Sequence, residues 1–258
     1  MKAARPRYTR SGHLFFRPGD NLDRLVDLML QTGYQEEFCL ALDFDPFFLA
    51  DLMAAGFLVM SASLGPADGE DGEDGDSGQE GQEPRFLLLP KLHLVRSVLF
   101  WDELRETKSA RRMLKSYELR YNSDFDLILE NCVRTHGDGW LTAPLCESIR
   151  QIREIPGCPV QPVSFGVYRE GELKAGEFGI IAGRVYTSYS GYHDENSSGT
   201  VQMLLTARWL RDRGFAFWDL GMPLDYKERL GARNLSPARF VGLFRGAAAR
   251  DAATVVVR

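Results

Sequence analysis

Hydrophobic and polar positions follow two different periods along this chain, and the change falls near residue 160. Before that point, apolar residues recur mostly at helical spacing, several times behind a residue that caps a helix. Asp45, Pro46 and Gly56 mark such a cap, first position and end. The spacing predicts helices over residues 20–30, 45–56, 101–117, 124–133 and 145–155. Shorter apolar runs at 86–89 and 92–100, and one beginning at Phe38, predict strands.

The last hundred residues favour strands. Three of them are predicted at 163–168, 172–181 and 184–191, with turns at Glu170-Gly171 and Ala182-Gly183, which indicates an antiparallel meander. A helix over 200–213 and strands at 215–220 and 240–244 follow. This order resembles the GCN5-related N-acyltransferase (GNAT) fold. We expect an α+β protein in which a GNAT-like domain has a mixed, largely antiparallel sheet flanked by helices.

An acidic, glycine-rich segment interrupts the chain at residues 64–84. It contains eight acidic residues and no Lys or Arg, and with so little to bury it is predicted to be disordered. It divides a small N-terminal α/β domain, residues 1–63, from the GNAT-like domain, residues 85–258. The whole chain has 31 basic and 36 acidic residues, a net charge of −5. The rest of the chain has 28 acidic and 31 basic residues, a net charge of +3, and is therefore mildly basic.

Several classes of protein are excluded by composition. No run approaches the roughly 18 apolar residues of a membrane helix, and Arg17, Pro18 and Gly19 interrupt any signal-peptide core. The four cysteines are far apart and without a CxxC pair, which favours buried free thiols over a zinc site or disulfides. We therefore expect a soluble, cytoplasmic protein without a metal site.

Two features are candidates for chemistry. Asp219 lies near the C-terminal end of the otherwise apolar run FAFWDL. Such a carboxylate either accepts hydrogen bonds from a neighbouring loop or acts in a cleft beside the sheet. Four cations share one face of the predicted helix over 101–117, which is either a solvated face or a phosphate-binding surface. They are Lys108, Arg111, Arg112 and Lys115. The loop HDENSSGT before the helix at 200 is acidic, unlike the basic, glycine-rich pyrophosphate loop of acyl-CoA enzymes, which disfavours coenzyme A.

From about Leu104 onward, the motifs resemble those of the leucyl/phenylalanyl-tRNA–protein transferases, whose acyltransferase-fold domain follows a small N-terminal domain. The matching segments occur in the family's order: ETKSARRMLK, ENCV with GDGWLT, SFGVYREGELKAGEFGI, ENSSGTVQMLL, FWDL and YKERLGA. ALDFDPFFLADLMAAGF resembles the family's N-terminal domain. Together the segments cover about three quarters of the chain.

The resemblance implies a role for individual residues. Asp219 matches the family's catalytic aspartate, and the four cations match its tRNA-contacting helix. Trp140, Asn196 and Ser198 match positions of the substrate site. Ser188 stands where the family has glutamate, next to Tyr189, and Gly221 stands where it has glutamine. Glu177 replaces an apolar residue on the neighbouring strand and could restore a carboxylate; all of these are counted as candidate substrate-binding residues.

The implied reaction is transfer of an amino acid, leucine or phenylalanine by resemblance, from a charged tRNA to the N-terminal α-amine of an acceptor protein. The product would be marked for N-degron degradation. The ester is already activated, so no cofactor is needed, and the protein is expected to act as a monomer with tRNA and an acceptor protein as partners. Two alternatives stay open: an acyl-CoA-dependent N-acetyltransferase of the same fold, and a non-catalytic relative that binds protein N-termini or tRNA.

Overall fold

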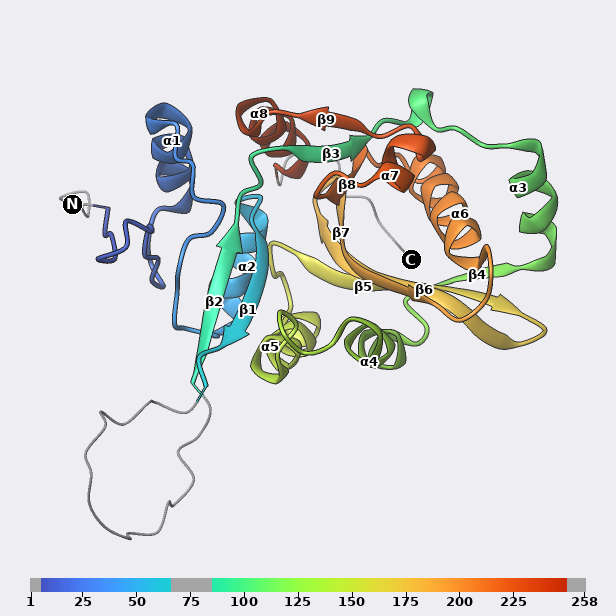
Figure 1. Ribbon diagram of the computed structural model, residues 1–258, viewed down its shortest axis with the longest axis horizontal. Coiled ribbons are helices and arrows are strands. Elements are labelled where there is room, and N and C mark those ends of the chain that lie inside the picture. Colours follow the sequence, from blue (N-terminus) through green and yellow to red (C-terminus); the bar gives the residue numbers. More distant parts are fainter. Residues whose placement is uncertain (1–5, 66–84, 250–258) are drawn as a thin grey trace, which may run out of the picture.

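Most predicted helices are confirmed in the computed structural model, which describes residues 6–65 and 85–249 (Figure 1). Helix α1 (Leu22–Thr32) begins behind Asn21, whose side chain accepts a hydrogen bond from the Arg24 backbone. Helix α2 (Pro46–Ala54) begins at the predicted Asp45 cap. The helices predicted near 124 and 145 are α4 (Phe125–His136) and α5 (Ala143–Glu154).

A seven-stranded sheet organises the rest of the chain, in the order β4-β5-β6-β7-β8-β3-β9. In that order, the strands are Glu118–Tyr121, Gln161–Arg169, Glu172–Ala182, Val185–His193, Phe217–Gly221, Arg96–Leu99 and Arg233–Leu235. All neighbours are antiparallel except β7 and β8, which are parallel. The predicted meander is confirmed as β5, β6 and β7, and Glu170 and Gly171 have positive φ angles, as a two-residue hairpin turn requires.

Helices cover both faces of this sheet, which makes the protein a mixed α+β structure. α4 and α5 lie on one face, while α6 (Ser198–Asp212) and the short α3 (Lys108–Met113) lie on the other (Figure 1). Each face has its own apolar core: Ile128 and Phe178 belong to the first, and Leu204 and Trp218 to the second. The first core continues into the N-terminal segment, where it includes Leu49.

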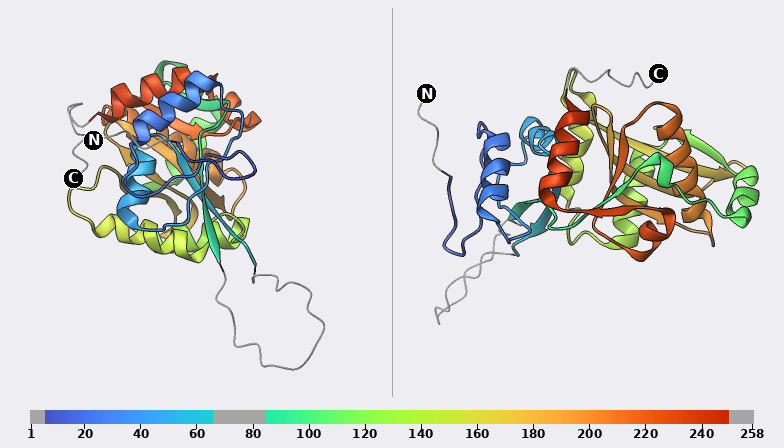
Figure 2. Two further views of the ribbon diagram at one scale, coloured as in Figure 1. Left: turned by 90° about the vertical axis from the view of Figure 1, so that its left-hand side faces the viewer. Right: turned by 90° about the horizontal axis from the view of Figure 1, so that it is seen from above.

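The N-terminal segment packs beside one end of the large sheet as a hairpin and two helices. Strands β1 (Leu58–Ser63) and β2 (Phe86–Lys91) pair with each other and so join the chain on both sides of residues 66–84. The predicted disordered insertion lies almost wholly outside the described residues. Helix α8 (Pro237–Ala248) lies beside α1, where Arg245 pairs with Asp23 and Asp27 (Figure 2).

Three predicted elements were wrong. The run beginning at Phe38 forms only isolated bridges and no strand. The helix over 101–117 is broken into a 3-10 turn (Trp101–Glu103), α3, and a second 3-10 turn (Leu114–Ser116), with β4 beginning directly afterwards. The Trp101 indole donates to the carbonyl of Phe215 at 2.6 Å, and Thr107 caps a new helix start, so tertiary contact overrides the helical pattern. The strand at 240–244 is part of α8, because Phe240, Val241 and Phe244 bury one helical face behind Pro237.

Candidate functional site at the parting of two parallel strands

Strands β7 and β8 run together for only three residue pairs and then part. The pairs are Val185–Phe217, Tyr186–Trp218 and Thr187–Asp219. Beyond them β7 continues to His193, whereas β8 ends at Gly221, whose φ of +74° turns the chain away. The register between β6 and β7 also shifts here, leaving Tyr189 as an extra residue, and such bulges re-aim side chains near functional sites. Candidate residues 188, 189, 219 and 221 all lie at this parting.

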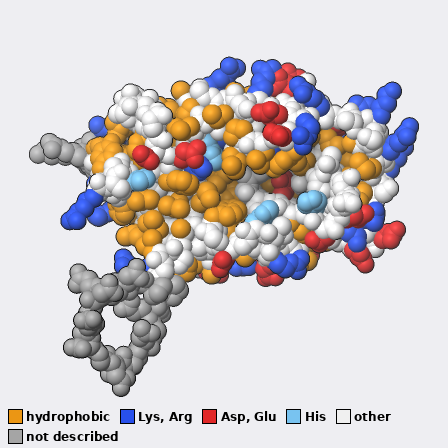
Figure 3. All heavy atoms as spheres, in the orientation of Figure 1, with side chains coloured by type: hydrophobic (Ala, Val, Ile, Leu, Met, Phe, Trp, Pro, Cys, Tyr) orange, Lys and Arg blue, Asp and Glu red, His pale blue; other side chains and the backbone are white. Residues whose placement is uncertain are grey.

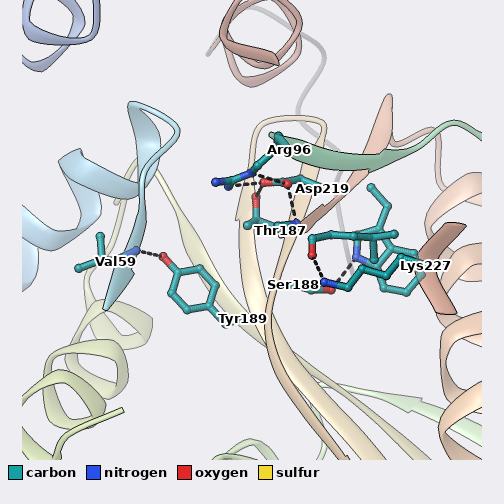
Figure 4. A network of polar contacts seen from close by, with 10 residues as sticks. Val59, Arg96, Thr187, Ser188, Tyr189, Asp219 and Lys227 are labelled. Atoms are coloured by element: carbon teal, nitrogen blue, oxygen red, sulfur yellow. Dashed lines mark hydrogen bonds and ion pairs between the residues drawn. The ribbon is translucent and has the colours of Figure 1, made fainter. Parts of the chain in front are cut away.

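Asp219 occupies one face of the parting and is completely enclosed by hydrogen-bond donors (Figure 4). Arg96 donates from Nε to Oδ1 at 2.8 Å and from Nη2 to Oδ2 at 2.6 Å, as a bidentate pair. Thr187 Oγ1 donates to Oδ2 at 2.9 Å, and the Gly221 backbone N–H donates to Oδ1 at 3.0 Å. A carboxylate has about four acceptor positions, so these four donors fill it. Arg96, in turn, stacks 4.5 Å from the ring centroid of Phe240.

A second carboxylate, Glu177 on β6, lies on the opposite face of the sheet from Asp219. Side chains of neighbouring residues in a strand point to opposite faces, and Trp218, next to Asp219, packs in the core beneath α6. The Trp218 indole donates to Ser188 Oγ at 2.7 Å, and Ser188 Oγ donates to Glu177 Oε2 at 3.1 Å. Glu177 is only 5% exposed, and its burial raises its pKa to about 7 despite opposing hydrogen bonds.

A buried lysine lies between the two carboxylates, at the end of β8. Lys227, on α7 (Asp225–Leu230), donates to the carbonyl oxygens of Leu220 at 2.6 Å and Met222 at 2.9 Å (Figure 4). Burial lowers its pKa to about 8, while the charges of Asp219 and Glu177 act in the opposite direction. These hydrogen bonds connect the loop after β8 to α7 and so stabilise the chain where β8 separates from β7.

Tyr189 and Trp140 connect this site to the N-terminal hairpin. The Tyr189 hydroxyl accepts a hydrogen bond from the Val59 backbone N–H on β1 at 3.1 Å, and burial raises the pKa of the phenol. The carbonyl of Trp140 accepts from both the backbone N–H and the hydroxyl of Ser61, each at 3.0 Å. Both candidate substrate residues therefore lie where the hairpin meets the large sheet.

Asn196 and Ser198 are not brought to Asp219. Ser198 is buried at the start of α6, where its hydroxyl donates to the carbonyls of Lys174 and Glu195, and Asn196 is exposed nearby. Lys174 lies next to the far end of β7, six residues along β6 from the partner of Thr187, which is about 20 Å at 3.3 Å per residue. The structure thus places the polar loop before α6 at the opposite end of β7 from the parting.

The four candidate cations lie on the far side of the molecule from the N-terminal hairpin. All four are exposed; three are on α3, and Lys115 is on the 3-10 turn that follows. Basic side chains gather at this end of the surface (Figure 3). A polar pocket of about 370 Å³ opens between α3 and α6 and is lined by Trp101, Leu104, Glu106, Arg111, Arg208, Arg211 and Asp212. Glu106 holds Arg208 in a bidentate pair and lies 3.3 Å from Arg111.

Sequence reasoning missed Arg96, Thr187, Trp218 and Lys227. Arg96 had a usable signal, because it is the lone charge in the apolar run HLVRSVLF, as Asp219 is in FAFWDL. Opposite charges isolated in two buried strands predict a pair. Lys227, by contrast, lies in the charged segment DYKERL, so nothing in the neighbouring sequence indicates that it is buried.

Within residues 6–65 and 85–249, no helix has the length and apolar character needed to cross a membrane. In the same residues, no three His, Cys, Asp or Glu side chains are grouped as metal ligands would be.

The chain is similar to several known proteins. The family model described as leucyl/phenylalanyl-tRNA protein transferase matches residues 98–245. A leucyl/phenylalanyl-tRNA–protein transferase from Pseudomonas aeruginosa is 31% identical over 150 residues, covering 56% of this chain and 65% of that protein. One from Stutzerimonas stutzeri is 28% identical with the same coverage, so the match spans just under two thirds of these relatives. A solved structure of L-PGS from Bacillus licheniformis has a TM-score of 0.38 at 12% identity, covering 95% of this chain and 90% of that one.

Proposed function

Because this chain belongs to the leucyl/phenylalanyl-tRNA protein transferase family, we propose that it is an aminoacyltransferase that moves an amino acid from charged tRNA to the α-amine of an acceptor protein. The acceptor would thereby be marked for N-degron degradation. The observation that carries the proposal is the parting of β7 and β8, which has a buried carboxylate on each face of the sheet and lies inside the region that the family model matches.

The reaction requires positioning more than it requires a cofactor. The α-amine attacks the ester carbonyl, a C–N bond forms, the C–O bond to the ribose breaks, and the ribose oxygen takes up a proton. The aminoacyl ester is already activated, so orientation supplies much of the acceleration, roughly 7–11 kcal/mol in favourable cases. The chain must hold the two substrates together and accept the proton of the amine.

Asp219 acts on this reaction indirectly, through the residues that it binds. Its acceptor positions are filled by Arg96, Thr187 and Gly221, so it acts by fixing the ends of β7 and β8 at the point where the amine and the ester meet. This makes it a positioning residue for the reaction. The backbone at Gly221 and the Ser188 hydroxyl border the same point and bind the reacting groups.

The transferred side chain lies between the hairpin and the large sheet. Trp140 and Tyr189 provide large, partly apolar surfaces there and attach the hairpin through Ser61 and Val59. Asn196 and Ser198 contribute from a distance, by shaping the loop that leads from β7 into α6. The N-terminal residues 1–63 form the small domain of the predicted division, completed by β2, which is contributed by the segment after the acidic insertion.

Exposed cations hold the tRNA through its phosphates. Lys108, Arg111, Arg112 and Lys115 give contacts that carry affinity without reading sequence. Arg208 and Arg211, on the other wall of the adjoining pocket, extend this basic surface onto α6. The surrounding domain is GNAT-like. Its antiparallel meander, followed by α6 and a parallel β8, supports that assignment. The protein acts as a cytoplasmic monomer.

An acceptor-by-donor matrix tests the proposal. Peptides with each N-terminal residue are incubated with a mixed pool of aminoacyl-tRNAs, and mass spectrometry measures the mass added to each peptide. Addition of one amino acid to a subset of peptides supports the transferase and names its substrates. Acetylation of peptides with acetyl-CoA would instead support the N-acetyltransferase, and binding of charged tRNA without any product would support the non-catalytic relative.

A further inference from the structure

Aminoacyl transfer, if it is the function proposed above, leaves one proton without a described acceptor. The acceptor α-amine is largely an ammonium at neutral pH, because its pKa is about 8. It must lose a proton before it attacks. Asp219 is 0% exposed and its four acceptor positions are filled by protein donors, so it has no position left for that proton.

Glu177 has the free acceptor that Asp219 lacks. Its Oε2 accepts the hydroxyl proton of Ser188, whereas its Oε1 is buried and has no partner at hydrogen-bonding geometry among the described residues. Gln202 and Tyr186 lie near enough to lower the pKa of the carboxyl, but neither reaches Oε1 at that geometry. An unpaired buried oxygen costs about 1–3 kcal/mol, so a group that persists in this form needs an explanation such as a functional role.

The direction of the hydrogen bonds fixes which oxygen is free. An indole N–H can only donate, so Trp218 donates to Ser188 Oγ at 2.7 Å. Ser188 must then point its own proton at Glu177 Oε2, 3.1 Å away. The chain Trp218–Ser188–Glu177 therefore orients the carboxyl and leaves Oε1 as the oxygen without a donor, beside the point where β7 ceases to pair with β8 after Thr187.

We propose that Glu177 is the proton acceptor for the incoming α-ammonium. The ammonium gives one proton to Oε1, and the neutral amine attacks the ester carbonyl. A C–N bond forms as the C–O bond to the ribose breaks, and the second nitrogen proton leaves on the ribose oxygen. The proton held by Glu177 then returns to solvent. This inference rests on the proposed function and assigns one of its steps.

The electrostatic surroundings of Glu177 suit it to accept a proton from an α-ammonium. Burial raises the pKa of Glu177 to about 7, within about one unit of an α-amine, so proton transfer between them is nearly balanced. Several charged or titratable groups face the carboxyl from every side. They are Lys227 and Tyr226 on α7, Tyr186 on β7 and Cys132 on α4, with the polar Gln202 on α6. Lys227 lowers the pKa of Glu177 and so favours the ionised form, which is the form that can accept a proton.

The pH dependence of kcat, measured with saturating charged tRNA and acceptor peptide, tests the role. In the wild type, kcat should rise as Glu177 ionises near pH 7 and then reach a plateau, because kcat reports groups of the bound complex. Glu177→Gln keeps the size of the side chain but cannot accept the proton, so kcat should fall by about 10²–10⁴-fold and lose the rise. Glu172→Gln, on the exposed end of the same strand, is the matched control and should behave as wild type.

Ser188→Ala supplies a second test if Glu177→Gln fails to fold. The Ser188 hydrogen bond lowers the pKa of Glu177, so its loss should move the rise in kcat to higher pH, whatever its effect on the height of the plateau. The kcat of Glu177→Asp should still rise with pH, because aspartate also has a carboxylate that can accept the proton. An unchanged pH profile in both Glu177→Gln and Ser188→Ala, with transfer intact, would overturn the role of Glu177 alone. Absence of transfer by the wild type with every donor and acceptor would overturn the proposed function and this inference together.

Discussion

The pair of Arg96 and Asp219 is the most buried charge pair of the described residues, with side-chain exposures of 1% and 0%, and its removal gives a sharp test. Removing one partner of such a pair leaves an uncompensated buried charge and costs about 3–5 kcal/mol. We therefore expect Arg96→Met and Asp219→Asn each to lower the free energy of unfolding by about 3–5 kcal/mol. For a chain of this size, this corresponds to a fall in Tm of roughly 10 °C.

The double variant should be more stable than either single variant. With both charges gone, no bare ion is buried, and the amide oxygen introduced by Asp219→Asn can still accept from Thr187 or Gly221. The remaining cost is that of one or two imperfect hydrogen bonds, about 1–3 kcal/mol. Chemical denaturation of the four proteins, at one pH and salt concentration, gives the coupling energy of the double-mutant cycle.

Additive effects would refute this reasoning. If the double variant lost the sum of the two single losses, within about 0.5 kcal/mol, the two side chains would contribute independently. The cycle also separates stability from function. Single-turnover transfer by the double variant, measured where it is fully folded, should still be lost if Asp219 positions the strand ends through Arg96, and unaltered transfer would remove that role.

Four further predictions concern other parts of the molecule. Replacing Arg111 and Arg112 together by Ala should make tRNA binding less dependent on salt, lowering the slope of log K against log salt by about two. Tyr189→Phe should destabilise the protein by about 1–3 kcal/mol in chemical denaturation, because the Val59 N–H loses its acceptor. Gly231→Ala should destabilise it by more than about 2 kcal/mol, since φ is +112° and a Cβ would lie 2.0 Å from the Glu103 carbonyl oxygen. Burial raises the pKa of Glu177 from 4.5 to about 7, so the folded protein favours the protonated form. The unfolding free energy of the wild type relative to Glu177→Gln should therefore fall between pH 4.5 and about 7, by up to about 3 kcal/mol.

Matched variants make each of these predictions decisive. Arg150→Ala, on α5, should leave the salt slope of tRNA binding unchanged, and an equal change there would contradict a specific basic surface. Gly12→Ala has a similar positive φ but open space around the new Cβ, so it should cost less than Gly231→Ala. A Tyr189→Phe variant as stable as the wild type would show that the hairpin contact contributes nothing. A stability difference at Glu177 that does not vary with pH would contradict its raised pKa.

The local elements were determined by the sequence wherever a cap, a turn residue and a hydrophobic period agreed. Asp45 and Pro46 at the start of α2, and Glu170 and Gly171 between β5 and β6, are such cases. These signals work because they concern backbone hydrogen bonds and φ angles within a few residues. Where they conflicted with distant contacts they failed, as at Trp101, whose indole binds the carbonyl of Phe215 and breaks a helix that the pattern favours.

The site was determined only in part by the sequence. Asp219 could be singled out, because a lone acid in an apolar strand is costly unless it is paired or functional. Its donors could not be assigned, since Arg96 is 123 positions away and reaches it only after β3 and β8 pair across the sheet. The two faces of the parting also depend on register, because a shift of one residue would exchange the neighbours Trp218 and Asp219 between them. The sequence therefore determined which groups are present, and the tertiary structure decided which carboxylate is saturated and which has a free oxygen.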